Sequence, residues 1–359
     1  MLHALPASAP EFRYDLLLQN LPGPADPSEW RGPHGEAPDI RVQPRPRWAK
    51  QRGYGTAFLL NSLYYFPRRL PAGYDLYHFT TQMLGAGARY APRSVVTVHD
   101  LVALRVRGNH SPLSTWLRRR HLPALRQARG LIFSSEYSRR DFLAAFDYPE
   151  ERTTVAHLGV QATFGRLQRD EARSRLALEP GRPVLLHVGS EERRKNVETL
   201  LDALAVLVRR WPDLLLVRIG GPSSRSRRRI ARHGLERHVR YLGGLSDADL
   251  GAWYSAADLF VFPSTYEGFG LPVLEAMQMG CPVVAADATS IPEITGNAAV
   301  LVGDPMDPDA LAGAVVSVLD DPERRARLAA AGAARAAEFT WARTAARTAE
   351  AYRRALGAA

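Results

Sequence analysis

The stretch LFVFPSTYEGFGLPVLEAMQMGCPVVAA, residues 259–286, contains an apolar run, a glycine-rich turn, a helical pattern and a second apolar run. Short apolar β-branched runs that alternate with helical patterns are typical of parallel sheets built from βαβ units. Gly268 and Gly270 flank Phe269 in the turn, and Pro272 stands where a helix can begin without losing a hydrogen bond. The stretch therefore predicts a βαβ unit whose turn can approach a ligand closely.

The same alternation extends over most of the 359 residues and predicts an α/β protein. At about 150 residues per domain, this length favours two domains, and the loss of periodicity over residues 156–164 places their boundary near residue 160. An amphipathic helix is expected over residues 196–210 with Asn196 as its N-cap, whereas residues 20–48 are expected to form a loop. The expected strands cover residues 12–18, 75–79, 94–98, 131–135, 184–188, 214–219, 239–242, 259–262 and 283–286.

The composition is that of a folded protein, because 46% of the residues are hydrophobic and 23% are charged. This balance argues against disorder. No apolar run reaches the roughly 18 residues that span a bilayer, and the first residues lack the pattern of a signal peptide, so we expect a cytoplasmic protein. The single cysteine, Cys281, excludes an internal disulfide or a cysteine-rich metal site, and we expect it to pack as a small apolar residue.

The formal net charge is +10, and only two of the 47 basic residues are lysines, Lys50 and Lys195. Two basic segments, residues 116–129 and 223–232, could contact nucleic acid or an anionic membrane. Neither carries the interleaved aromatic residues of a base-stacking surface, so we expect no nucleic-acid partner. Helical periodicity instead predicts solvated arginine faces, with peripheral membrane contact by residues 116–129 as the alternative. In that segment, the residues available for packing are Leu117, Leu122 and Leu125.

A second informative stretch is HVGSEERRKNVETLL, residues 187–201. Arg193, Arg194 and Lys195 fall in the turn between a predicted strand and the helix that follows. Cations at the carboxyl end of a parallel strand are positioned to meet phosphate oxygens. A solvated charge run is the alternative, but retention of Lys195 in a chain that otherwise uses arginine favours phosphate contact.

Two glutamates accompany the glycine-rich turn. The amides of residues 268–273 would face an anion at the positive end of a helix, Glu275 in the first turn could accept hydrogen bonds from sugar hydroxyls, and Glu267 could reach the same cleft from the loop. The alternative is that a first-turn glutamate only complements the helix dipole. His99 with Asp100 and the glycines of residues 219–222 also follow predicted strands and are weaker candidates.

Asp247 and Asp249 could suggest a metal-bound sugar nucleotide. Ser246 stands three residues before Asp249, which is the spacing of a helix-capping box. We therefore expect these aspartates to begin a helix over residues 247–256 and expect no metal site.

In combination, these motifs resemble those of the retaining nucleotide-sugar glycosyltransferases of family 4, the group 1 transferases with the GT-B fold. The branch resembled includes bacterial mannosyltransferases of O-antigen and exopolysaccharide synthesis. The resemblance implies a Rossmann-like acceptor domain over residues 1–160, a Rossmann-like donor domain over residues 161–340 and a C-terminal helix, residues 341–359, that packs back on the first domain. It rests on residues 259–286 together with VVTVHDL (95–101), FSSEYSRRDF (133–142), HVGSEERRKN (187–196), VRYLGGLSDADL (239–250) and SIPEITGNAAVLVGDP (290–305).

The resemblance also implies roles for single residues. Lys195 and Arg194 would hold the donor diphosphate, Glu267 would contact the donor sugar, Glu275 would bind the ribose hydroxyls, and His99 would hydrogen-bond the transferring sugar. Many relatives have proline at the position of Arg193, so that residue is left out of the set. The remaining donor-binding positions that it implies are Gly189, Gly220, Leu242, Gly268, Phe269, Gly270, Leu271 and Val273.

The implied reaction moves a sugar, mannose from GDP-mannose as the leading choice and otherwise a UDP-sugar, to a glycan or lipid-linked saccharide with retention and without a metal or other cofactor. Cell-surface polysaccharide, such as lipopolysaccharide, would be the product. The alternatives are another GT-B enzyme, such as a disaccharide synthase or phosphorylase, and a catalytically impaired sugar-nucleotide-binding protein. The last arises because relatives begin with a strand and a glycine-rich turn, whereas this chain opens at the expected end of the following helix, residues 2–5. We expect a chain without that first unit to be weakly active.

Overall fold

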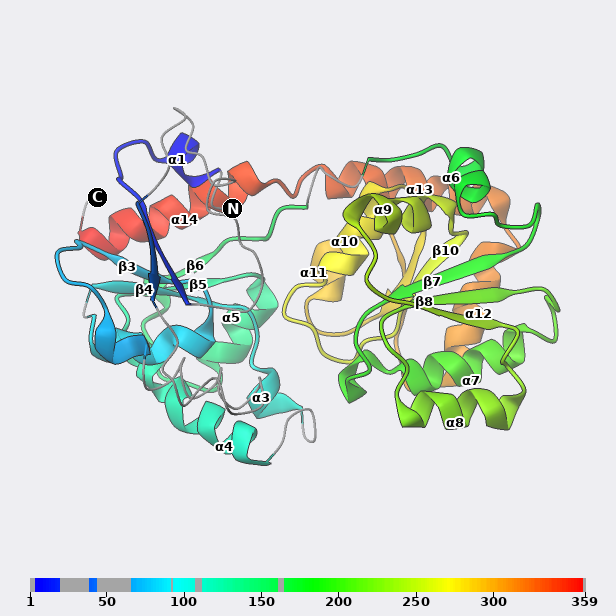
Figure 1. Ribbon diagram of the computed structural model, residues 1–359, viewed down its shortest axis with the longest axis horizontal. Helices are drawn as coiled ribbons and strands as arrows, with labels where there is room; N and C mark the ends of the chain where they lie inside the picture. The colour runs from blue at the N-terminus through cyan, green and yellow to red at the C-terminus, as the bar shows by residue number, and fades with distance from the viewer. Residues whose placement is uncertain are drawn as a thin grey trace. The chain divides into compact units, whose positions relative to one another are not determined.

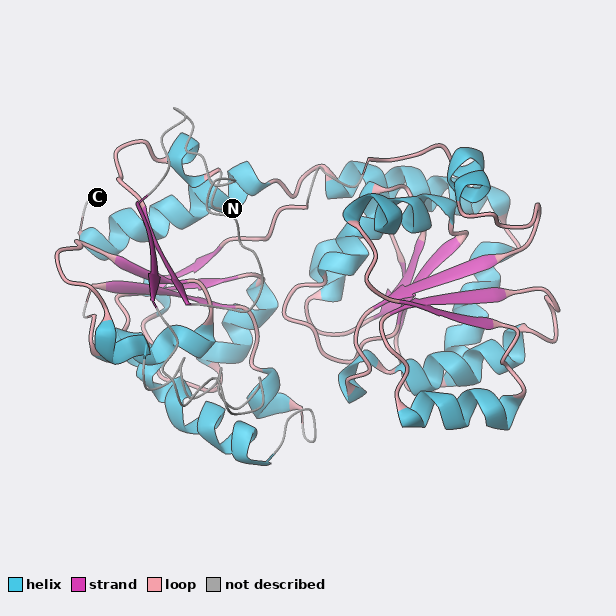
Figure 2. Ribbon diagram, viewed as in Figure 1, coloured by secondary structure: helices cyan, strands magenta, loops and turns pink. Residues whose placement is uncertain are grey.

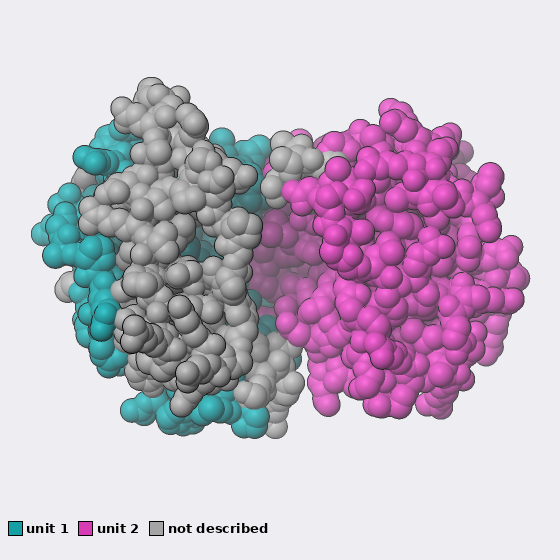
Figure 3. Space-filling view, viewed as in Figure 1, with its two compact units in different colours: residues 1–159, 340–359 teal, residues 160–339 magenta. Residues whose placement is uncertain are grey.

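The computed structural model describes residues 4–19, 39–43, 66–91, 93–106, 112–160 and 165–357. The chain divides into two compact units, which Figure 3 colours separately. Unit 1 comprises Met1–Gly159 and Thr340–Ala359, and unit 2 comprises Val160–Phe339. Each unit contains a parallel sheet with helices on both faces (Figure 2), which confirms the predicted α/β class.

Unit 2 is built on a six-stranded parallel sheet with the order β12-β11-β10-β7-β8-β9. The chain adds strands on one side of β7 and then returns to its other side with β10, so the strand order reverses between these two neighbours. In open parallel sheets, ligands bind outside the carboxyl ends of the strands at such a reversal. The strands are β7 (Val184–Val188), β8 (Leu215–Ile219), β9 (Val239–Leu242), β10 (Leu259–Phe262), β11 (Val283–Ala286) and β12 (Val300–Val302).

Helices cover both faces of this sheet (Figure 1). One layer holds α7 (Val197–Leu207), α8 (Ser224–His233) and α12 (Pro308–Leu319). Leucines and valines of α7 and α12 are buried in the core of this unit, and Ile230 of α8 packs against it. The opposite layer holds α6 (Arg169–Arg175), α9 (Asp247–Ala256), α10 (Leu271–Gln278), α11 (Ile291–Thr295) and α13 (Pro322–Ala336). A 3₁₀ turn, η9 (Arg193–Lys195), joins β7 to α7.

Unit 1 contains a four-stranded parallel sheet with the order β3-β4-β5-β6 and a separate parallel pair, β1 with β2. The strands are β1 (Asp15–Gln19), β2 (Asp39–Gln43), β3 (Tyr77–Phe79), β4 (Ser94–Val98), β5 (Gly130–Phe133) and β6 (Thr153–Val155). The helices are α1 (Leu5–Ser8), α3 (Val102–Arg105), α4 (Pro112–His121), α5 (Glu136–Leu143) and α14 (Trp341–Leu356), with 3₁₀ turns η4 (Phe66–Arg69), η5 (Gln82–Arg89), η6 (Leu122–Gln127) and η7 (Glu150–Arg152).

The C-terminal helix α14 packs on the sheet of unit 1, where Ala345 and Tyr352 join a core cluster with Val95 and Ile132. The chain enters unit 2 after Gly159 and returns to unit 1 at Thr340. A Cβ on Gly159 would lie 2.3 Å from the backbone nitrogen of Trp341, so only glycine lets the two connecting segments pass this closely.

Several local predictions need correction. The expected loop of residues 20–48 contains β2, and β1 begins at Asp15 and pairs with β2 rather than with the main sheet. The opening helical turn is Leu5–Ser8, later than expected. The segment 116–129 is not one helix, because α4 ends at His121 and a 3₁₀ turn with proline near its start follows. Strands β6 and β12, of three residues each, were missed, whereas the equally short β3 lies within the expected strand of residues 75–79.

Other local predictions are confirmed. Ser246 accepts the hydrogen bond of the Asp249 amide at the start of α9. Leu117, Leu122 and Leu125 are buried, and so is Cys281 with 2% exposure. No helix in the described part of the chain is long and apolar enough to cross a membrane.

Many arginines have structural partners, which explains part of the charge excess. Buried Asp258 forms ion pairs with Arg169, Arg173 and Arg325, which tie α6 and α13 to the start of β10. In α8, the arginines were predicted to lie mainly on a solvent face; Arg227 and Arg228 are exposed, whereas Arg225 and Arg229 are half-buried and form ion pairs with Glu198 of α7.

Candidate active site

The turn after β7 places two cations at the carboxyl ends of β7 and β10, where the strand order reverses. Asn196 ends this turn in the left-handed conformation, with φ of 54°. Its side-chain amide donates hydrogen bonds to the carbonyl oxygens of Pro263 at 3.2 Å and Pro305 at 2.5 Å. Asn196 is therefore the N-cap residue of α7, as predicted, but its side chain forms no capping hydrogen bond. The side chain instead links the turn to the loops that contain Pro263 and Pro305.

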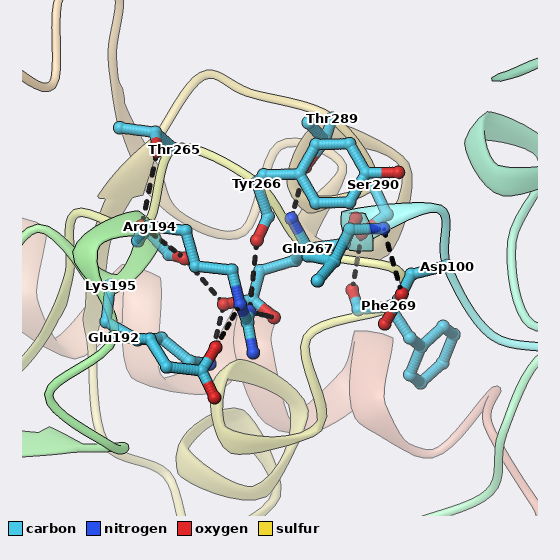
Figure 4. A network of polar contacts seen from close by, with 12 residues as sticks. Asp100, Glu192, Arg194, Lys195, Thr265, Tyr266, Glu267, Phe269, Thr289 and Ser290 are labelled. Atoms are coloured by element: carbon cyan, nitrogen blue, oxygen red, sulfur yellow. Dashed lines mark hydrogen bonds and ion pairs between the residues drawn. The ribbon is translucent and has the colours of Figure 1, made fainter. Parts of the chain in front are cut away.

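Glu267 lies between the two cations (Figure 4). Its carboxylate accepts hydrogen bonds from Lys195 Nζ at 2.6 Å, Arg194 Nη1 at 2.9 Å and Ser264 Oγ at 2.5 Å. Arg194 also donates from Nε to Glu192 at 2.7 Å. Glu267 and Lys195 are 7% and 8% exposed, so these charges are desolvated and depend on one another.

The glycine-rich turn leads directly into α10. Gly270 has φ of +109°, and a Cβ there would lie 2.7 Å from Ile291 Cδ1, so a larger residue would be both strained and obstructed. Among the described residues, no side chain caps α10, although the first amides of a helix need acceptors. An anion placed at Leu271 would supply such an acceptor at the positive end of the helix dipole.

Glu275 was predicted in the first turn of the helix, but it lies in the second turn, because α10 begins at Leu271. Its Oε2 accepts a hydrogen bond at 2.9 Å from the hydroxyl of Tyr254, a residue of α9 that is fully buried. Burial raises the pKa of Glu275, and the hydrogen bond from Tyr254 partly opposes that shift. Tyr254 was not among the predicted site residues. It is identified by its hydrogen bond to Glu275 in the folded structure.

The predicted backbone positions Gly189 and Gly220 lie just beyond β7 and β8, beside Leu242, the last residue of β9. The amide of Gly189 donates to the carbonyl of Ile219 at 3.0 Å, and that of Gly220 donates to Leu242 at 2.9 Å. A Cβ on Gly220 would lie 2.4 Å from the carbonyl oxygen of Gly189. The backbone of these residues is therefore closely packed at the carboxyl ends of the strands.

Two predicted binding residues are buried in the protein interior. Val273 is 0% exposed. The Phe269 ring is 5% exposed and packs edge-on against Phe339, with ring centroids 6.0 Å apart. Contact of either residue with a ligand would therefore run through the backbone.

A network of hydrogen bonds around Glu191 lies just before the turn Arg193–Lys195 in the chain. This network was not predicted from the sequence. Glu191 accepts hydrogen bonds from Arg218 at 2.8 Å, Ser223 at 2.9 Å and Tyr241 at 3.2 Å. Arg218 is fully buried within β8 and also bonds His187, whose pKa is held well below its usual value by burial and by this cation. The available signal was a charged residue inside the apolar run LLLVRI.

His99 belongs to unit 1 and follows β4. Its Nε2 lies 3.1 Å from the carbonyl oxygen of Thr80, which can only accept, so Nε2 carries a proton. The His99 carbonyl accepts hydrogen bonds from Ser134 at 3.1 Å and Ser138 at 3.0 Å, and its amide donates to Gln82 at 3.1 Å. The structure thus gives His99 a fixed backbone within its own unit and gathers the other predicted residues in unit 2.

Sequence comparisons cover both units. The family described as Glycosyl transferases group 1 matches residues 168–335, and Glycosyltransferase Family 4 matches residues 12–164. O-antigen chain mannosyltransferase B of Escherichia coli is 33% identical over 270 residues, which are 73% of this chain and 70% of that protein. D-inositol 3-phosphate glycosyltransferase of Thermobispora bispora is 35% identical over 63% of this chain, and the match spans only 56% of that relative's length.

Solved structures share the fold. Sucrose-phosphate synthase from Thermosynechococcus elongatus aligns with a TM-score of 0.73 and 25% identity over 99% of this chain and 92% of its own. HepE from Anabaena, solved in complex with UDP and glucose, aligns with a TM-score of 0.73 and 22% identity over 97% of this chain and 94% of its own. The chain therefore belongs to the group 1, family 4 glycosyltransferases of GT-B fold, enzymes that transfer a sugar from a nucleotide-sugar donor.

Proposed function

We propose that this protein transfers a hexose, with mannose from GDP-mannose as the leading choice, to a glycan or lipid-linked saccharide and retains the anomeric configuration. The observation that carries the proposal is the paired cations Arg194 and Lys195 beside the uncapped N-terminus of α10. This arrangement suits a nucleoside diphosphate, and the name of the Escherichia coli relative supports mannose.

In the proposed reaction, Arg194 and Lys195 would lie beside the diphosphate, where negative charge develops. As the bond between the sugar C1 and the diphosphate oxygen breaks, negative charge grows on the diphosphate and positive charge grows on the sugar. Fixed cations and helix-terminal amides stabilise the first without reorganising. Retention then follows if the acceptor hydroxyl attacks C1 from the face that the diphosphate leaves and gives its proton to a diphosphate oxygen. We propose that Arg194 and Lys195 serve in place of a metal.

In this proposal, Glu267 neutralises the positive charges of the site while no donor is bound. Its carboxylate compensates Arg194 and Lys195 before a donor arrives, at 2.9 and 2.6 Å. A donor diphosphate would share those cations, and the carboxylate would turn toward the hydroxyls of the donor sugar.

The test is a panel of nucleotide sugars, including GDP-mannose, UDP-glucose and UDP-N-acetylglucosamine, in thermal-shift and turnover assays with and without EDTA. We expect GDP-mannose to raise the melting temperature and to be consumed equally in both buffers, with an α-linked product by NMR. Stabilisation by a UDP-sugar alone would refute the donor, an inverted product would refute retention, and loss of turnover in EDTA would refute metal independence.

A second candidate is transfer to a small phosphorylated acceptor. The name of the similar D-inositol 3-phosphate glycosyltransferase contains such an acceptor, and the name of the sucrose-phosphate synthase contains a phosphorylated sugar product. Product formation with a sugar phosphate or inositol phosphate, and none with a saccharide acceptor, would select this candidate.

We further propose that α4 contacts an anionic membrane. Leu113 and Trp116 are 57% and 56% exposed on this helix, and Arg119 and Arg120 are exposed beside them. Apolar residues bordered by arginines match the surface of an anionic bilayer. Trp116→Ala should reduce binding to phosphatidylglycerol vesicles but not affect the weak binding to phosphatidylcholine vesicles. The control Arg227→Ala, on the basic helix α8, should behave as wild type, and equal binding by all three proteins would refute the contact.

A further inference from the structure

Thr289 has an unusual backbone conformation, because its φ is +56° and it is neither glycine nor asparagine. For a β-branched residue, this left-handed conformation is a genuine outlier. Such strain persists only where neighbouring contacts maintain it.

Those contacts lead to the glycine-rich turn (Figure 4). The Glu267 amide donates a hydrogen bond to Thr289 Oγ1 at 3.0 Å. The hydroxyl of Ser290, which is fully buried, lies 3.1 Å from the Glu267 carbonyl and 2.9 Å from the Phe269 carbonyl, so its single proton is shared between them. Ile291 fills the space that a side chain on Gly270 would need.

Three consecutive residues, Thr289–Ser290–Ile291, thus hold three points of the turn, and we call this segment the strap. Its own position is fixed, because the Ile291 amide donates to Ala288 at 3.1 Å and the Ile294 amide donates to Ser290 at 3.1 Å as α11 begins. Ile291 is 0% exposed. The strap is therefore attached to a packed helix, while the turn itself is rich in glycine and has little intrinsic preference for one conformation.

We infer that Thr289 and Ser290 are positioning residues that keep the glycine-rich turn in the conformation that binds the donor diphosphate. The inference rests on the proposed function. Without the strap, the turn would become ordered only when the donor binds. The entropic cost of that ordering would make the binding free energy less favourable. In this strained conformation, the Thr289 hydroxyl accepts the hydrogen bond of the Glu267 amide.

The test compares nucleoside diphosphates with monophosphates. Calorimetry gives dissociation constants for GDP, GMP, UDP and UMP, and the diphosphate preference is the monophosphate constant divided by the diphosphate constant. Thr289→Val removes the hydroxyl and keeps the shape, whereas Thr289→Ser keeps the hydroxyl. We expect Val to lower the diphosphate preference by about fivefold to tenfold, the loss of roughly one hydrogen bond. We expect Ser to retain the preference and monophosphate affinity to change little.

Ser290→Ala provides a second variant and should lower the preference similarly. The matched control is Thr295→Val in the same helix, because Thr295 is fully buried and its hydroxyl bonds only within α11 and at its end, to Ile291 and Gly296. It should lower the melting temperature and leave the preference unchanged. If Thr289→Val and Ser290→Ala also lower only the melting temperature, the strap is merely structural and the inference is wrong. If wild type shows no diphosphate preference, the proposed donor site fails as well.

Discussion

The carboxyl ends of the two parallel sheets are built from different chemistry. In unit 2, this edge carries Arg194, Lys195 and Glu267 in mutual ion pairs with little exposure to solvent. In unit 1, the corresponding edge carries His99, whose amide donates a hydrogen bond to Gln82 and whose carbonyl accepts one from Ser134, both of them neutral residues. One edge is organised by charge and the other by uncharged hydrogen bonds.

In the proposed reaction, the charged edge of unit 2 would meet the donor diphosphate. A diphosphate needs fixed cations, because its charge grows as it leaves. A sugar offers hydroxyls, which neutral donors and acceptors can orient. Changes at the charged edge should therefore alter nucleotide affinity, whereas changes at the neutral edge should alter turnover alone.

The largest effect is expected for Glu267→Gln. The neutral amide cannot compensate Arg194 and Lys195, so the site gains positive charge and GDP or UDP should bind a few times more tightly. Turnover should fall by about 10³-fold, since the carboxylate no longer meets the donor sugar. Calorimetry and initial rates measure the two quantities. Loss of nucleotide affinity alongside turnover would show that Glu267 holds the nucleotide itself.

His99→Ala tests the neutral edge. We expect kcat to fall by about 10²-fold, as for loss of one group that stabilises a transition state, while the dissociation constant of GDP or UDP stays at the wild-type value. Ser134→Ala should give a smaller loss of kcat, because the Ser138 hydroxyl still holds the His99 carbonyl. A His99 variant with wild-type kcat would remove this residue from the site.

A smaller effect is expected for Tyr254→Phe, which removes the hydroxyl that orients Glu275. The preference for a ribonucleotide over its 2′-deoxy form should fall by about fivefold, the loss of roughly one hydrogen bond. Tyr241→Phe is the control, because that hydroxyl bonds Glu191 instead. If Tyr254→Phe leaves the ribose preference unchanged while Glu275→Ala lowers it, Glu275 recognises the ribose hydroxyls without help from Tyr254.

The same pair predicts a pH dependence. Burial raises the pKa of Glu275, and the Tyr254 hydrogen bond lowers it. Nucleotide affinity should therefore fall with decreasing pH at a higher pH than an ordinary glutamate would give. Tyr254→Phe removes the lowering contribution and should shift the midpoint upward. A midpoint that moves downward or stays fixed would contradict this coupling.

Much of the fold could be predicted because local patterns are strong where packing is regular. Strands β4, β7, β9, β10 and β11 have the expected bounds, since each is a mainly apolar run that ends near turn residues. Strand β6 was missed because two of its three residues are threonines, and β2 was missed because its neighbours are rich in proline and glycine. Strand β12 was missed as well, whereas the equally short β3 was expected within residues 75–79.

The site could be predicted in part for a similar reason. Arg194, Lys195 and Glu267 come together because parallel strands end at one edge, and that rule can be applied to a sequence. Tyr254, Arg218 and Thr289 reach the site through tertiary contacts or an unusual backbone angle. No spacing in the sequence signals such contacts.

The most direct test of the charged edge is the dissociation constant of GDP and UDP for wild type and Lys195→Met, measured by calorimetry. Methionine keeps the apolar stem of the side chain and removes the charge. We predict that whichever nucleotide binds wild type will bind the variant about 100-fold more weakly, as for loss of one charge-assisted hydrogen bond to a phosphate. Equal affinity in the two proteins would contradict the assignment of this edge to the donor diphosphate.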